Sequence, residues 1–227
     1  MTLQIAAICD TGWVMASDRM EQIDRTSSSV NKIFTDDELG ITYAVCGSTA
    51  VARLAARELI DELRSGSWPI TGLQQQYWLE TIADKAWRDA SATITTKPVE
   101  ADNTAQGITI FFHNVPTIGW ALYIGQSSLA QAFSNKRVRA DYTNPAICFF
   151  EKYYSPDLLP RQLAYLAAHS ICIAPYWNKS GIEGLDITIY ENENGKGTIH
   201  RMEGGELTHL KKRSDELDHW LTNHFDS

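Results

Sequence analysis

Two apolar segments at the start of the chain limit most strongly what this sequence can fold into. Residues 3–9 and 12–18 are rich in β-forming side chains, and Asp10-Thr11-Gly12 lies between them. Two such runs joined by a short turn that contains glycine predict an antiparallel hairpin. Because both runs are largely apolar, we expect two buried strands.

The pattern of strand, turn and strand recurs and then changes to a helical period. Val30–Thr35 and Ile41–Cys46 form a second predicted strand pair. From residue 48, apolar side chains recur on one helical face until Ser65-Gly66, and a second helix is predicted from about residue 73 to residue 90. The chain therefore begins with four strands followed by two helices.

In the second half of the chain, each of two predicted strand pairs is followed by a helix. The spacing of its apolar residues predicts strands at 108–113, 117–124, 185–190 and 198–202, and helices at 156–174 and from about 206. In the strand at 185–190, apolar and polar residues alternate, which is typical of a strand with one covered face.

Helices that are grouped, rather than alternating singly with strands, favour an α+β fold over a doubly wound parallel sheet. We predict a four-layer αββα sandwich, in which two antiparallel sheets pack face to face between two helical layers. The length of 227 residues and the absence of a linker-like segment favour a single domain over residues 1–227.

Charge and hydropathy exclude several classes of function. The net charge is −8 and the sequence pI is about 5.2, which argues against nucleic acid and anionic membrane surfaces as partners. No apolar run approaches the roughly 20 residues that span a bilayer, and the first residues lack the features of a secretory signal. We therefore expect a soluble, cytoplasmic protein.

Cysteine and histidine residues indicate neither a disulfide framework nor a metal site. The four cysteines stand in apolar contexts without paired spacing, and we expect them to be buried free thiols. The six histidines form no metal-binding pattern. We predict no metal and no cofactor. The cysteines are Cys9, Cys46, Cys148 and Cys172.

The hydroxyl of Thr2 is a candidate nucleophile. A threonine at the first position of a mature chain carries its own general base, because its α-amine has a pKa of about 7.7–8.0. A side chain as small as that of threonine normally permits removal of the initiator methionine, and we expect this removal to expose Thr2.

The residues that accompany Thr2 resemble the proteasome β-subunit and bacterial HslV family of N-terminal threonine (Ntn) hydrolases. The similarity runs from Thr2 to Asp18, continues through Val30-Asn31-Lys32-Ile33-Phe34 and Tyr43-Ala44-Val45-Cys46-Gly47, and includes Gly125-Gln126-Ser127. It resumes from residue 154 to residue 187, while residues 129–150 resemble an insertion. The family has the αββα fold, so the resemblance implies that fold here.

The resemblance also implies a role for each matching residue. Thr2 would attack the scissile carbonyl, Lys32 would place a positive charge beside it, and Asp18 would pair with Lys32. The backbone N–H of Gly47 would stabilise the oxyanion, Val45 would line the first specificity pocket, and Ser127 would take the place of the serine in the family's turn.

Two further implications concern partners and activity. A threonine-type endopeptidase of this family acts on polypeptide substrates inside a homo-oligomeric ring, with an unfoldase as a further partner. Leu3, Gln126 and Asn178 depart from the family pattern, so a catalytically silent structural or binding subunit is the alternative. A third interpretation is an N-terminal amidohydrolase that acts on a small amide.

Overall fold

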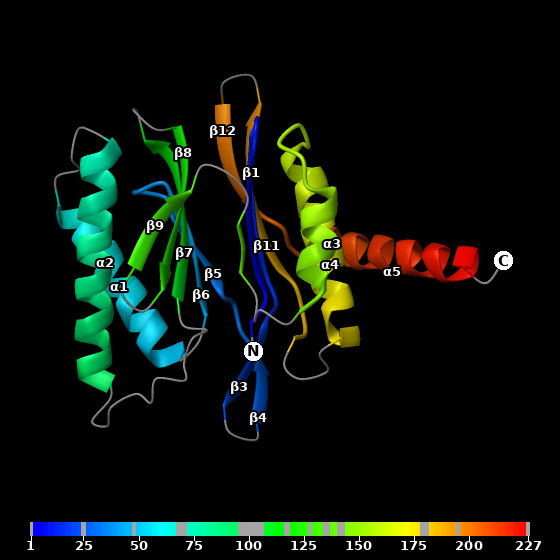
Figure 1. Cartoon of the computed structure of the whole chain (residues 1–227), viewed down its shortest axis with the longest axis horizontal. Coiled ribbons are helices and arrows are strands. Elements are labelled where there is room, and N and C mark those ends of the chain that lie inside the picture. The colour runs from blue at the N-terminus through cyan, green and yellow to red at the C-terminus, as the bar shows by residue number, and fades with distance from the viewer. Residues whose placement is uncertain are drawn as a thin grey trace. The chain divides into compact units, whose positions relative to one another are not determined.

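The computed structural model describes residues 2–23, 26–46, 49–66, 72–94, 107–115, 119–126, 129–133, 137–139, 144–177, 182–193 and 196–225. The chain divides into two compact units: residues 1–31 with 135–227 form unit 1, and residues 32–134 form unit 2. Each unit has an antiparallel sheet with helices (Figure 1). In the described residues, the chain is thus a mixed α/β protein with two five-stranded sheets, one small hairpin and five helices.

The sheet of unit 1 combines strands from both ends of the sequence. Its order is β10-β1-β2-β11-β12, and every neighbouring pair is antiparallel. The predicted first hairpin is confirmed, with β1 and β2 paired from Gln4↔Ser17 to Cys9↔Gly12. The strands are β1 (Gln4–Cys9), β2 (Gly12–Ser17), β10 (Arg137–Arg139), β11 (Asp186–Glu193) and β12 (Lys196–Arg201).

Three helices complete unit 1: α3 (Ala146–Tyr153), α4 (Pro160–Trp177) and α5 (Gly205–Phe225). Ile5, Val14 and Ile187, from three adjacent strands, share one apolar cluster with residues of α3 and α4. The predicted helices at 156–174 and from 206 are confirmed. The first begins later than predicted, at Pro160, where the fixed φ of proline suits the opening turn of a helix.

Gly12 shows why the first turn requires glycine. A Cβ atom at this position would lie 1.9 Å from the backbone oxygen of Tyr190 and 2.9 Å from Cγ of Pro160. Gly12 pairs with Glu191 of β11, so the absence of a side chain lets two strands and α4 approach each other closely.

A short hairpin that the sequence did not predict follows β2. β3 (Met20–Ile23) and β4 (Thr26–Ser29) pair from Met20↔Ser29 to Ile23↔Thr26. Serine-rich segments have little hydrophobic alternation, so this hairpin carries no periodic signal that distinguishes it from a polar loop.

Unit 2 is formed by one continuous segment. Its sheet order, β5-β6-β7-β8-β9, follows the chain, and all its pairs are antiparallel. Helices α1 (Thr49–Ser65) and α2 (Gly72–Ile94) confirm the two predicted helices. Ile41 and Val45 pack in one cluster with Leu59 and Leu63 of α1. The strands are β5 (Ile33–Asp36), β6 (Ile41–Cys46), β7 (Gly107–Val115), β8 (Gly119–Gln126) and β9 (Leu129–Phe133).

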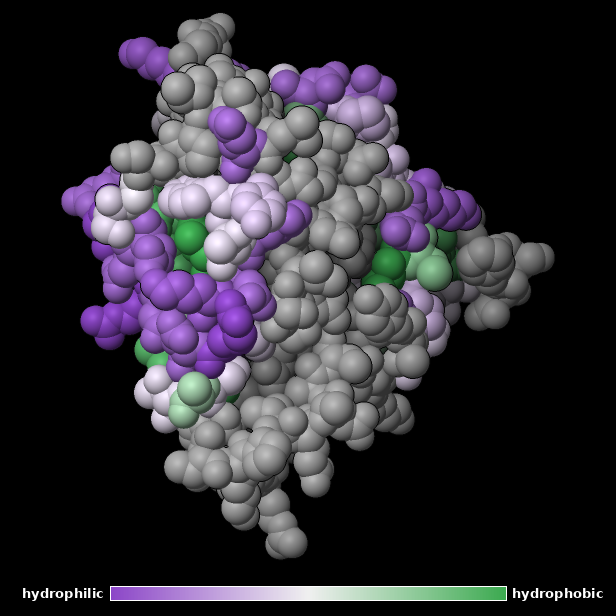
Figure 2. All heavy atoms as spheres, turned by 60° about the vertical axis from the view of Figure 1, so that its left-hand side comes forward, coloured by the Kyte–Doolittle hydropathy of each residue, from purple (hydrophilic) through white to green (hydrophobic). Residues whose placement is uncertain are grey.

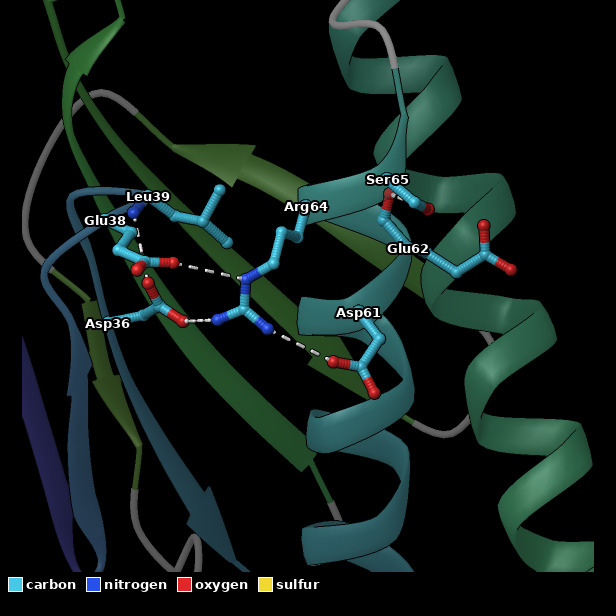
Figure 3. A network of polar contacts seen from close by, with 7 residues as sticks. All are labelled: Asp36, Glu38, Leu39, Asp61, Glu62, Arg64 and Ser65. Carbon is cyan, nitrogen blue, oxygen red and sulfur yellow. Dashed lines mark hydrogen bonds and ion pairs between the residues drawn. The ribbon is translucent and has the colours of Figure 1, made fainter.

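Arg64 joins the end of α1 to the turn between β5 and β6 (Figure 3). Its guanidinium group lies 2.5 Å from Oδ2 of Asp36, 3.7 Å from Oε2 of Glu38 and 3.3 Å from Oδ1 of Asp61. The other oxygen of Asp36 accepts a hydrogen bond from the N–H of Leu39 at 3.0 Å. This network holds the turn against the helix at the surface of unit 2.

The solvent side of α1 and α2 carries charged residues of both signs. Seen from this side, the described surface is mainly hydrophilic (Figure 2). In the part of the chain that the structure describes, no helix is long and apolar enough to cross a membrane. The exposed charged residues include Arg53, Arg57, Asp61, Lys85, Arg88 and Asp89.

Three expectations from the sequence need correction. Residues 129–150 resembled an insertion, but they contain β9, β10 and the first half of α3. β9 and β10 are edge strands of the two sheets, and short edge strands carry little periodic signal. Cys148 is exposed on α3 and Cys172 is partly exposed, so only Cys9 and Cys46 are buried as expected.

The third correction concerns β11, which was expected to have one covered face. Asp186, Thr188 and Tyr190 are 2%, 1% and 6% exposed, although they alternate with the core residues Ile187 and Ile189. Both faces of this strand are therefore buried. Alternation of polar and apolar residues did not indicate solvent exposure here, because the polar side chains are held inside the protein.

Candidate functional site

The end of the first hairpin brings together two of the predicted catalytic residues, Thr2 and Asp18. Beyond the pair Gln4↔Ser17, the N–H of Asp18 donates to the oxygen of Leu3 at 3.1 Å. The N–H of Leu3 in turn donates to Oδ1 of Asp18 at 2.8 Å. Thr2 is the next residue along the chain and is partly exposed. The predicted nucleophile and the predicted carboxylate therefore lie at the same end of the β1-β2 pair.

Two backbone groups hold the carboxylate of Asp18. Its side chain is fully buried, and Oδ2 accepts a hydrogen bond from the N–H of Met20 at 3.1 Å. Hydrogen bonds from backbone N–H groups favour the charged form of a buried carboxylate. Because the nitrogen of Leu3 is bonded to the carbonyl carbon of Thr2, this negative charge lies beside the backbone of Thr2.

A buried polar row, which the sequence pattern did not predict, lies next to this position. Gln4, Ser17 and Asp186 are neighbours across β1, β2 and β11, and each is at most 2% exposed. In the sequence, this row is indicated by the polar residue at every second position of β11. That pattern fits a solvated strand face equally well. The row places hydrogen-bonding groups one residue from Asp18 and two residues from Thr2.

Asp186 is the charged member of this row. Both of its carboxylate oxygens accept hydrogen bonds from Nη2 of Arg201, at 2.9 and 3.1 Å. The hydroxyl of Ser17, which is fully buried, makes no hydrogen bond to any other residue that the structure describes. Asp186 is thus neutralised by an ion pair, while Ser17 keeps a hydroxyl donor beside the end of the hairpin.

Lys32 belongs to unit 2 and lies at the start of strand β5. It immediately precedes β5, is 6% exposed, and its backbone oxygen accepts a hydrogen bond from the N–H of Val45 at 3.2 Å. This bond continues the β5-β6 ladder by one pair beyond Ile33↔Ala44. Lys32 is therefore positioned beside Val45, near the end of β6. Val45 precedes Gly47 by two residues in the sequence.

Of the three predicted binding residues, the structure describes Val45. Val45 is 4% exposed and packs in the apolar cluster under α1. Gly47 and Ser127 lie outside the described residues, as does Asn178. The predicted roles of Val45, Gly47 and Ser127 stay predictions.

Two thiols of unit 1 are poorly suited to act as nucleophiles. Burial raises the pKa of Cys9, whose Sγ lies 3.4 Å from the backbone oxygen of Gly12. Burial also raises the pKa of Cys172. Because the thiolate is the reactive form, both side chains are weak nucleophiles at neutral pH. Among the residues that the structure describes, no group of three or more His, Cys, Asp and Glu side chains is placed to hold a metal ion.

The fold of the whole chain is similar to that of several solved Anbu structures. Anbu from Hyphomicrobium sp. strain MC1 matches with a TM-score of 0.75 at 13% identity, over 99% of this chain and 97% of that one. Anbu from Yersinia bercovieri, described as an ancestral β-subunit, matches with a TM-score of 0.77 at 13% identity, over 100% and 97%. The helical assembly of the Anbu complex from Pseudomonas aeruginosa provides a third match, with a TM-score of 0.73 at 13% identity, over 99% and 96%.

These matches correct one expectation from the sequence. The assignment to the proteasome β-subunit and HslV family is wrong, because the matching structures are Anbu, a distinct family of proteasome-like proteins. At 13% identity the similarity establishes the fold alone. No protein-family model matches the chain, and the comparison with curated proteins finds no match.

Proposed function

We propose that this chain is a subunit of a proteasome-like, self-associating peptidase whose nucleophile is the hydroxyl of Thr2. The observation that carries this proposal is the buried carboxylate of Asp18, held by two backbone N–H groups beside the backbone of Thr2. The similarity to Anbu structures over nearly the whole chain supports it.

The proposed reaction begins after removal of Met1. The free α-amine of Thr2 accepts the proton of the hydroxyl, and Oγ attacks the carbonyl carbon of a peptide bond. The C–N bond breaks, the amine product leaves with the proton, and an ester to Thr2 remains. Water then hydrolyses this ester and regenerates the free hydroxyl.

In this proposal the other predicted residues stabilise the charges that form during the reaction or position the reacting groups. Lys32 lowers the cost of deprotonating Thr2, and Asp18 orients Lys32. The N–H of Gly47 donates to the oxyanion, a contribution of about 3–4 kcal/mol where such donors have been removed elsewhere. Val45 and Ser127 contribute to the substrate site. The substrates are polypeptides, and an unfoldase is the expected partner.

We also propose that units 1 and 2 form one domain over residues 1–227, with the four-layer arrangement expected of an Ntn hydrolase. The similarity to Anbu structures extends over nearly the whole chain and so includes both units, which supports a single domain. The Anbu complex from Pseudomonas aeruginosa forms a helical assembly, which supports self-association of this chain.

Intact-mass measurement and a peptidase assay on the purified protein test the catalytic proposal. We expect a mass that lacks Met1 and cleavage of a fluorogenic peptide with a hydrophobic residue before the reporter group. Thr2→Ala should abolish cleavage, whereas Thr2→Ser retains a hydroxyl and should keep part of it. Cleavage that Thr2→Ala leaves unchanged would refute the proposal.

A catalytically silent subunit is the second candidate, and a specific observation favours it. Both oxygens of Asp18 already accept backbone hydrogen bonds that close the end of a strand pair, which is also a purely structural role. In addition, Leu3, which takes a position that is polar in active relatives of the resembled family, is fully buried. Retention of Met1 in a protein that still forms large assemblies would support this alternative. A monomer that cleaves small amides would support the third interpretation, an amidohydrolase.

A further inference from the structure

A cavity of about 810 Å³ lies between α4 and α5, two helices on the same side of the unit 1 sheet (Figure 1). Its volume is within the range of about 300–1,000 Å³ that is typical of small-molecule sites. Neither Thr2 nor Asp18 is among its lining residues. The cavity is therefore a candidate binding site that the proposed peptidase chemistry does not use.

The inner wall of the cavity is apolar. Leu166, Met202 and Leu210 line it, and each is at most 8% exposed and belongs to the apolar cluster of unit 1. Leu158 also lines the cavity, is partly buried, and packs against the same cluster. We call these four residues the apolar wall. Because covering apolar surface is favourable in proportion to the area removed from water, this wall favours a ligand with an apolar chain.

Two of the charged residues in the lining already have partners. Arg161 and Glu206 lie close together, with 3.7 Å between Nη1 and Oε1. Nε of Arg161 also donates to Oε1 of Glu191 at 3.2 Å. The other oxygen of Glu206 lies 2.8 Å from Nε2 of His200. Arg161 and Glu206 are thus held by each other and by neighbouring side chains, which leaves neither of them as the main attraction for an ionic ligand.

Arg213 is the remaining cation of the lining, and it is exposed at the opening of the cavity. Its guanidinium group lies 5.4 Å from the centre of the Tyr165 ring, and the hydroxyl of Tyr165 donates to the backbone oxygen of Arg213 at 3.1 Å. Arg213 forms no ion pair with any carboxylate that the structure describes. Because an aromatic ring is a weak acceptor, the N–H groups of the guanidinium stay available to an anion.

We propose that the cavity between α4 and α5 binds a small amphipathic monocarboxylate, such as a medium-chain fatty acid. The carboxylate pairs with the guanidinium group of Arg213, whose planar set of donors fits two carboxylate oxygens. The apolar chain lies along the apolar wall.

The lining favours this class of ligand over two others. A peptide would bring backbone N–H and C=O groups against the apolar wall, whose side chains cannot pair with them. A ligand with two negative charges would meet Glu206 in place of a second unpaired cation. A single carboxylate on an apolar chain matches both the wall and Arg213.

Isothermal titration calorimetry on the full chain at neutral pH tests the proposal, with octanoate as the probe. We expect one octanoate to bind per chain. Affinity should rise about two- to fourfold for each added methylene from hexanoate through octanoate to decanoate, because the apolar wall covers the chain. Octan-1-ol has the same chain without the charge and should bind about fivefold more weakly.

Arg213→Gln tests the contact with the carboxylate. It should weaken octanoate binding by about fivefold and change octan-1-ol binding by less than about twofold. Lys212→Gln is the matched control, because it makes the same change in charge at the neighbouring position of α5, where the side chain does not line the cavity. It should leave the binding of both probes unchanged.

Leu158→Ser tests the contact with the chain. It should weaken the binding of octanoate and octan-1-ol alike, by about threefold or more. Leu159→Ser is its control, since Leu159 is the next residue, is 54% exposed and does not line the cavity. Circular dichroism confirms that each variant is folded.

The outcomes separate this proposal from the peptidase proposal. No octanoate binding, equal affinity for octanoate and octan-1-ol, or unchanged octanoate binding by Arg213→Gln would each overturn the carboxylate site. A cavity that another subunit fills in the assembled protein would give the first of these results. Thr2→Ala should abolish peptide cleavage and leave octanoate binding unchanged, so failure of one proposal cannot be mistaken for failure of the other.

Discussion

The two units of this protein differ in how the chain forms them. Unit 2 is one continuous segment whose strands lie in chain order, whereas the sheet of unit 1 joins strands from both ends of the sequence. Closing the long loop between β2 and β11 costs more conformational entropy than forming the successive hairpins of unit 2. Unit 1 therefore depends on partners that are far apart in sequence.

The units also differ in where their charged contacts lie. In unit 1, Asp18 and Asp186 are almost completely buried and rely on specific hydrogen bonds. In unit 2, the network around Arg64 lies at the surface, where water can replace a lost partner. Loss of a polar partner should therefore lower the free energy of unfolding strongly in unit 1 and only slightly in the Arg64 network.

The largest expected effect concerns the cooperativity of unfolding, that is, whether the two units unfold together. Leu163 of unit 1 and Leu63 of unit 2 are at most 1% exposed, and Leu→Ala at such positions costs about 2–5 kcal/mol. If residues 1–227 form one cooperative domain, as we propose, either substitution should lower protection from hydrogen exchange in both units. Mass spectrometry of exchanged peptides measures this. A loss confined to the substituted unit would contradict a single domain.

Removing a buried carboxylate should have the next largest effect. Asp18→Ala leaves the N–H groups of Leu3 and Met20 without their acceptor, and we expect a loss of about 2–4 kcal/mol in the free energy of unfolding. Asp36→Ala in unit 2 is the matched control, because its carboxylate also accepts a backbone N–H but is 14% exposed; we expect about 1 kcal/mol. Urea unfolding measures both, and equal losses would argue against the contrast between the units.

The close approach at Gly12 should be sensitive to a single methyl group. Gly12→Ala places Cβ against the backbone of Tyr190, and we expect a loss of about 1–3 kcal/mol through displaced strands. Gly205→Ala is the control in the same unit, since nothing lies within 4 Å of its added Cβ. Its free energy of unfolding should change by no more than about 0.5 kcal/mol. Thermal unfolding of both variants reveals whether the contact is as close as described.

The smallest expected effect is a pH dependence in unit 1. Burial lowers the pKa of His169 below its ordinary value of 6.5, with a smaller opposing effect from Asp218. The unfolded chain therefore binds a proton more readily than the folded protein. Stability should be constant above about pH 6.5 and should fall as the pH drops from there toward the folded-state pKa.

Urea midpoints over roughly pH 5 to 8 measure this dependence. His169→Gln should remove part of the slope below about pH 6.5, whereas the same substitution at the exposed His209 should not. A wild-type midpoint that rises on acidification would have the opposite sign and would refute the assignment.

Local patterns in the sequence were sufficient for most of the secondary structure. The first hairpin and the helices α1, α2, α4 and α5 were predicted because their apolar residues recur with the period of a strand or a helix. The same pattern placed Thr2 and Asp18 at one end of a hairpin, because an antiparallel pair with a short turn has only one such end. The edge strands β9 and β10 and the serine-rich β3-β4 pair carry little periodicity and were missed.

Which polar residues are buried, and what holds them, became apparent only in the folded protein. Nothing in the spacing of Asp186 or Ser17 distinguishes a solvated face from a covered one, because burial depends on elements that are distant in sequence. The ion pair of Asp186 with Arg201 and the two backbone bonds of Asp18 exist only once β1, β2, β11 and β12 are assembled. Strand and helix periods are thus local properties that the amino-acid order specifies directly, whereas long-range packing sets the environment of each charge.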